Sequence, residues 1–151
     1  MKNFSKILYA TDFSEISEHA FDYALTLADK FSASLIIMHV INEPVDLRGF
    51  YVPNISFETM ENEIALGAEK MMERFCSKKL ENVAHYEKYT VLGVPYDEIL
   101  KKAVEEKVDL IVIGTHGRAG IDHFLFGSTA ERVVRKAACP VMTVRPPSTG
   151  Q

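Results

Sequence analysis

The chain has 151 residues, of which 47% are hydrophobic and 25% charged, and its formal net charge is −4 with histidine neutral. This composition is typical of a globular domain and argues against a disordered chain. The apolar runs are too short for membrane helices, and a basic stripe of the kind that binds duplex nucleic acid is missing. We therefore expect one domain over residues 1–146, a flexible tail over 147–151, and no membrane or nucleic-acid partner.

The N-terminus and the cysteines predict a cytoplasmic protein. The first residues, Met1–Lys6, lead straight into a strand-like run, without the apolar region and cleavage site of a secretory signal. Thiols stay reduced in the cytoplasm. Because Cys76 and Cys139 have neither a CxxC neighbour nor metal-ligand spacing, we expect both to be small core residues.

Hydrophobic periodicity divides the first half of the chain into alternating strands and helices. Short apolar runs indicate buried strands, and apolar residues that recur on one stripe indicate helices. The elements are a strand at Lys6–Thr11, a helix capped by Ser14 or Ser17 that runs to Phe31, a strand at Leu35–Val40, an aperiodic loop over 41–57, and a helix over Glu58–Lys79.

The second half of the chain continues the alternation. Its elements are a strand at Tyr86–Leu92, a short helix capped by Asp97 that runs to Val104, a strand at Asp109–Ile113, a helix that begins at Gly127 or Ser128 and runs to Ala137, and a strand at Val141–Val144. Strands that alternate with helices indicate an α/β fold with a mainly parallel sheet. Right-handed crossovers then place helices on both faces of that sheet.

A glycine-bearing loop after the fourth predicted strand has the properties of a phosphate site. Gly114 and Gly117 lack a Cβ atom, so the backbone there can approach a ligand closely. Gly127 and Ser128 begin the last helix, where unpaired amides and the positive end of the helix dipole favour anions. The same residues could instead only shape a strand–loop–helix connection, with Ser128 as a helix cap. The residues alone leave both interpretations open.

Other motifs for nucleotides, catalysis and metals are missing. The chain has no P-loop lysine motif, no GxGxxG after the first strand, no GxSxG elbow, and no histidine pair with metal spacing. Asp12 follows the first strand and is either a site residue or a cap of the first helix. His39 lies inside the second strand, where a hydrogen-bonded core histidine is favoured over a ligand. We predict no catalytic residue and no metal site.

The spacing Gly114-x2-Gly117-x9-Gly127-Ser128 resembles the nucleotide signature of the universal stress protein family, G-x2-G-x9-G-[S/T]. The segment from Ile7 to Ser14 is similar to the family's first strand and its Asp-x-Ser turn, and 140–144 is similar to its closing strand. The resemblance implies a Rossmann-like fold of the adenine nucleotide alpha hydrolase-like type. This fold is a single open five-stranded parallel sheet, in the strand order 3-2-1-4-5, with helices on both faces.

The resemblance also implies an adenine nucleotide in the crevice between the first and fourth strands. The cofactor is then ATP, with AMP or ADP as alternatives and Mg²⁺ as a candidate companion ion. Asp12 would contact the adenosine, the Val40 backbone the adenine edge, and 127–129 the β- and γ-phosphates. The implied binding residues are Ala10, Thr11, Asp12, Val40, Gly114, Gly117, Gly127, Ser128 and Thr129. The expected site also includes Thr115, His116 and Arg118 of the same loop, where His116 or Arg118 could add positive charge.

Members of the family also form homodimers, commonly through the last strand, here Val141–Val144, which would cover an exposed sheet edge. The expected function is that of an ATP-binding regulatory module in the stress response. We expect hydrolysis to be absent or slow, because phosphoryl transfer needs a positioned nucleophile and concentrated positive charge, and a general base is not evident. Two alternatives stay open, a slow Mg-dependent ATPase and a nucleotide-free dimeric adaptor.

Overall fold

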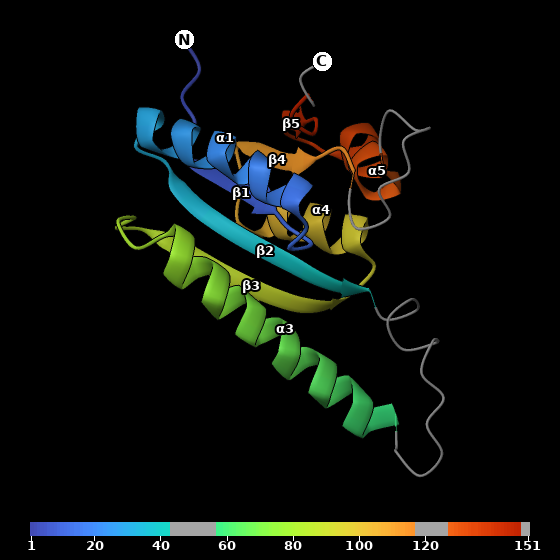
Figure 1. Ribbon diagram of the computed structural model, residues 1–151. Coiled ribbons are helices and arrows are strands. Elements are labelled where there is room, and N and C mark those ends of the chain that lie inside the picture. Colours follow the sequence, from blue (N-terminus) through green and yellow to red (C-terminus); the bar gives the residue numbers. More distant parts are fainter. Residues whose placement is uncertain (43–56, 117–126, 149–151) are drawn as a thin grey trace.

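A computed structural model describes residues 1–42, 57–116 and 127–148. It shows a sheet between two helical layers (Figure 1). Five parallel strands lie in the order β3-β2-β1-β4-β5, which confirms the expected topology. The elements are β1 Lys6–Ala10, α1 Glu15–Phe31, β2 Ser34–Asn42, α3 Phe57–Lys79, β3 Tyr86–Gly93, α4 Pro95–Glu105, β4 Leu110–Gly114, α5 Ser128–Lys136 and β5 Val141–Val144. Most of the predicted 41–57 loop and the end of the predicted tail lie outside the described residues.

The sheet has two cores because successive strand residues point to opposite faces. Ile7 and Tyr9 of β1 pack beneath α1 and α3, whereas Leu8 and Ala10 pack against α4 and α5. The same alternation continues through β2 and β4. Since both faces are covered, these strands are apolar at nearly every position, as is typical of parallel sheets.

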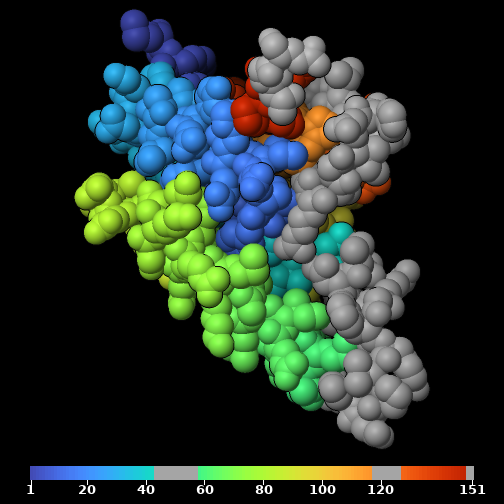
Figure 2. Space-filling model, viewed as in Figure 1, coloured from blue at the N-terminus to red at the C-terminus, as the bar shows by residue number. Residues whose placement is uncertain are grey.

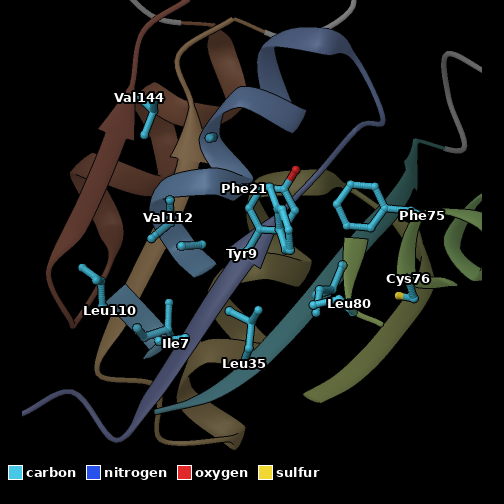
Figure 3. Close-up of a cluster of buried hydrophobic side chains, with 14 of the residues drawn as sticks. Ile7, Tyr9, Phe21, Leu35, Phe75, Cys76, Leu80, Leu110, Val112 and Val144 are labelled. Carbon is cyan, nitrogen blue, oxygen red and sulfur yellow. The ribbon is translucent and has the colours of Figure 1, made fainter. Parts of the chain in front are cut away.

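Aromatic rings join the two helices of one layer to the sheet. Phe75 of α3 lies with its ring centroid 5.1 Å from Phe21 of α1 and 6.0 Å from Tyr9 of β1 (Figure 3). Tyr9 and Phe21 also meet edge to face, with centroids 5.3 Å apart. Figure 2 shows α1 in blue and α3 in green side by side on this face of the molecule. The cluster therefore fixes both helices against the central strand.

The helix starts resolve one alternative and correct one prediction. Ser14 is the N-cap of α1, where its Oγ accepts the amide of Ser17 at 3.2 Å. The prediction that Asp97 caps the following short helix is wrong, because α4 begins at Pro95 with Val94 in the cap position. Proline fits the first helical position, where its fixed φ suits the helix and its missing N–H is not needed. Asp97 lies in the first turn, where its charge complements the helix dipole.

None of the helices within the described ranges combines the length and the apolar character that crossing a bilayer requires. The longest, α3, has 23 residues and alternates apolar positions with glutamates and lysines.

Gly67, in the middle of α3, is a position where stability can be raised. A Cβ atom built there would meet no heavy atom within 4 Å, and glycine is less favourable than alanine inside a helix by roughly 0.5–1 kcal/mol. We expect Gly67→Ala to raise the free energy of unfolding by about that amount. Urea unfolding followed by circular dichroism measures the change. A lower midpoint in the variant would contradict an open helical site at Gly67.

Candidate functional site

A pocket lies at the carboxyl ends of β1, β2 and β4, where the strand order reverses between β1 and β4. The arrowhead of β4 points toward α5, which contributes its first turn to the pocket (Figure 1). Such a reversal is where open α/β sheets bind their ligands. The volume of about 320 Å³ falls within the range of small-molecule sites, roughly 300–1,000 Å³.

Every predicted site residue that belongs to the described part of the chain lines this pocket. These residues are Ala10, Thr11, Asp12, Val40, Gly114, Thr115, His116, Gly127, Ser128 and Thr129. They come from four separate segments, which only the parallel sheet brings together. The other two predicted residues, Gly117 and Arg118, lie outside the described residues.

The pocket also contains residues that the sequence analysis missed: Ser17, Met38, His39, Asn42, Pro95, Ile99, Ile113 and Ala130. Met38 could have been found, because it lies two positions before Val40 and so shares its face of β2. Pro95 and Ile99 had no such signal, since only the packing of α4 against β2 brings them to the site.

The two sides of the pocket differ in chemistry. Met38, Val40 and Ile99 belong to an apolar wall that is formed by β2 and α4. Asp12 and Thr115 belong to a polar side that is formed by the ends of β1 and β4 and by the start of α5. A ligand with one flat apolar part and one anionic part suits this division.

The turn between β1 and α1 is held by its own side chains. Thr11 Oγ1 accepts the amide of Phe13 at 2.9 Å, and Asp12 Oδ1 accepts the amide of Ser14 at 3.0 Å. Phe13 has a φ of 64°, in the left-handed region that non-glycine residues rarely adopt. Because Ser14 is the cap of α1, Asp12 organises the turn that precedes the helix.

The start of α5 presents backbone amides to the pocket. Gly127 is its N-cap, and within the described residues no side chain caps this helix. The amide of Gly127 donates to the carbonyl of Thr115, which ties the end of β4 to the start of the helix. Ser128 is the first helical residue, so the interpretation of its hydroxyl as the helix cap is wrong. The first-turn amides and the positive end of the dipole favour an anion here.

Gly114 has a packing role beside its place in the pocket. A Cβ atom built there would meet Ile16 Cγ2 at 3.5 Å and Ser17 Cα at 3.6 Å, which is ordinary van der Waals contact. The side of Gly114 where a Cβ would stand therefore faces the first turn of α1. The close approach of α1 to β4 at this point brings Ser17 into the lining of the pocket.

The described residues hold no cluster of three or more potential metal ligands. Among the described residues that line the pocket, the titratable groups are Asp12, His39 and His116, and no lysine or arginine is present. Cys76 is buried in one core and Cys139 packs against the other, as expected. Burial raises the pKa of both thiols, so neither is an activated nucleophile.

An open parallel sheet with a pocket at its topological switch point defines a Rossmann-like fold, in which ligands bind at that point. The chain belongs to the universal stress protein family, whose model matches residues 3–145. Universal stress protein MJ0577 of Methanocaldococcus jannaschii is 36% identical over 155 aligned positions, which cover 94% of this chain and 95% of that protein.

Solved structures agree with this assignment. The structure of MJ0577 matches with a TM-score of 0.84 at 32% identity and covers 98% of this chain and 100% of that one. A universal stress protein in complex with cAMP has a TM-score of 0.62 at 24% identity, with 95% and 98% of the two chains covered. One from Archaeoglobus fulgidus in complex with dAMP has a TM-score of 0.63 at 22% identity, with the same coverage. The last two show that the fold is shared.

Proposed function

We propose that this protein binds ATP in the pocket at the switch point and acts as a regulatory module whose ATP hydrolysis is absent or slow. The observation that carries the proposal is the pocket itself, whose lining combines an apolar wall with the first turn of α5, a helix that no side chain of the described residues caps. Family members that are described in complex with cAMP and dAMP support an adenine nucleotide as the ligand class.

In this proposal each part of the nucleotide meets the side of the pocket that suits it. The purine lies against Met38, Val40 and Ile99, because burial of its faces on apolar side chains is favourable. The Asp12 carboxylate accepts hydrogen bonds from the ribose hydroxyls. The phosphates lie at 127–129, where helix amides and hydroxyls donate to them. Gly117 belongs to the proposed site on motif spacing alone, and Arg118 belongs to it as the charged residue that follows Gly117 in the same loop.

Slow or absent hydrolysis is supported by the described part of the lining, which contains neither lysine nor arginine, so that Arg118 is the single lysine or arginine of the proposed site. Phosphoryl transfer is accelerated by positive charge on the transferred group, from a metal ion and from lysine or arginine. The described lining offers amides, hydroxyls and the His116 imidazole, with Asp12 as its carboxylate. Mg²⁺ would then accompany ATP mainly as a counter-ion, held by the phosphates themselves.

We also propose a homodimer in which the β5 strands of two copies pair. β5 is an edge strand of the sheet, next to β4, and its residues Val141, Met142 and Thr143 are only half-buried. An exposed edge with apolar side chains is a template for a further strand. Light scattering after size-exclusion chromatography measures the mass, and a monomer at micromolar concentration would contradict this part of the proposal.

The test of the function combines a binding titration with a turnover assay. Calorimetry with ATP, AMP and adenosine should show binding, and ATP should raise the melting temperature, because a ligand that binds the native state stabilises it. Multiple-turnover assays with Mg²⁺ should release little phosphate. Sustained turnover would identify a slow ATPase instead. A melting temperature that ignores ATP, with no heat of binding, would indicate the nucleotide-free adaptor.

The hydroxyls at the start of α5 give a prediction that separates the phosphates from the nucleoside. Ser128→Ala combined with Thr129→Ala should weaken ATP binding roughly tenfold to a hundredfold, because hydrogen bonds to charged groups contribute about 1.5–3 kcal/mol. Adenosine binding should change little. Calorimetry measures both ligands, with the exposed Ser77→Ala on α3 as the control. Equal losses for ATP and adenosine would rule out these residues as phosphate ligands.

A further inference from the structure

A buried histidine lies against the turn that carries Asp12. His39 of β2 is 5% exposed, and its Nδ1 lies 2.8 Å from the carbonyl oxygen of Thr11. A carbonyl oxygen can only accept, so Nδ1 carries a proton and donates it in this hydrogen bond. Through His39, β2 therefore holds the carbonyl of Thr11, the residue directly before Asp12.

The ring of the same histidine also supports the next residue of the turn. The centroids of His39 and Phe13 are 4.5 Å apart, and Phe13 also meets the core residue Phe75 at 6.2 Å. Phe13 needs such support, because its left-handed backbone with a φ of 64° costs about 1–2 kcal/mol for a residue with a Cβ atom. A conformation of this kind persists only where surrounding contacts impose it.

The remaining bonds of the turn join it to α1. Thr11 Oγ1 lies 2.9 Å from Ser17 Oγ, and Ser17 Oγ donates to the carbonyl of Ser14 at 2.9 Å. These contacts attach the turn to the helix that follows it. His39 attaches the turn to β2, where its own side chain also lines the pocket. The backbone on both sides of Asp12 is thus fixed before a ligand arrives.

We propose that His39 is a positioning residue, which holds the β1–α1 turn so that the Asp12 carboxylate is ordered for the nucleoside part of the ligand. The inference rests on the proposed function and adds a residue to its site. His39 acts through the turn, and it improves binding because a site that is already ordered loses less conformational entropy on binding. His39 therefore strengthens binding of the nucleoside part of the ligand, and by the same factor whether or not phosphates are attached.

The first experiment compares two substitutions that differ in one donor. In His39→Asn the side-chain amide can donate from near the position of Nδ1, whereas His39→Leu is apolar and cannot. We expect His39→Leu to weaken ATP, AMP and adenosine by a common factor of roughly tenfold, and His39→Asn to recover most of that loss. His85→Leu, at an exposed histidine just before β3, is the control. A lower melting temperature with unchanged affinity for all three ligands would overturn the proposal.

The second experiment asks whether His39 acts through Asp12. If it does, His39→Leu should weaken adenosine much less in an Asp12→Asn background than in the wild type, since contacting parts of one unit are not additive. Additive losses would overturn the proposal. The wild-type titration separates the two proposals. If the wild type binds and His39→Leu binds equally well, only the role of His39 fails. If the wild type binds no adenine nucleotide, both the proposed function and the proposed role of His39 fail.

Discussion

Replacement of Phe75 by alanine should lower the free energy of unfolding by about 3–5 kcal/mol. Phe75 is 5% exposed, and its ring contacts those of Tyr9 and Phe21 (Figure 3). Its removal would leave a cavity between α3, α1 and β1, because the surrounding side chains relax only in part. For a chain of this length the loss corresponds to a fall in melting temperature of roughly 10 °C.

Urea unfolding measures this loss, and a neighbour on the same helix is the control. Met71→Ala, four residues before Phe75 and 45% exposed, should change the free energy of unfolding by no more than about 0.5 kcal/mol. Phe75→Leu should fall between the two, since it keeps most of the buried volume and loses the aromatic contacts. Similar losses for Phe75→Ala and Met71→Ala would mean that α3 does not pack on the sheet through Phe75.

The sequence predicts the fold well because the central strands are buried on both faces. Ile36 and Ile37 of β2, for example, belong to opposite cores, so the apolar run is uninterrupted and its limits are clear. The order of the strands has no such signal in the apolar runs. Periodicity predicts only that strands and helices alternate, whereas the order 3-2-1-4-5 is implied by the resemblance to the universal stress protein family.

Helix starts show where local patterns become ambiguous. Ser14 and Ser17 are both good N-cap residues, and only the hydrogen bond from the Ser17 amide to Ser14 Oγ distinguishes them. Asp97 has the same preference for the cap. Pro95 nevertheless begins α4 two residues earlier, since its backbone is already close to the helical conformation.

The site was predictable where its residues follow strands and hidden where it depends on packing. Asp12 and Thr115 come directly after β1 and β4, so topology alone places them at one edge. Ile99 reaches the pocket through the position of α4 over the sheet. The expectation that His39 is buried and hydrogen-bonded is confirmed. The sequence gives no sign that its partner is the carbonyl of Thr11 or that its side chain lines the pocket.

Gly127→Val should abolish most of the ATP binding, with at least a hundredfold loss of affinity, while the fold is kept. Gly127 has φ −66° and ψ 156°, which any L-residue adopts without strain. Valine is a poorer N-cap than glycine and should cost about 1 kcal/mol of stability or less. An N-cap side chain lies beside the first-turn amides of its helix, so the two methyl groups should obstruct the approach of the proposed phosphates to α5, and a buried phosphate without those donors is strongly disfavoured.

Calorimetry with ATP and adenosine, together with melting temperatures, measures this effect. Adenosine should bind Gly127→Val far better than ATP does, because its proposed contacts lie at Asp12 and on the wall formed by β2 and α4. Gly127→Ala is the graded control and should lose less affinity for ATP, since a single methyl group intrudes less than an isopropyl group. If Gly127→Val binds ATP as the wild type does, the phosphates do not lie at the start of α5. The apolar wall would then be the part of the proposed site that survives, and the anionic end of the ligand would have to reach a different segment of the chain.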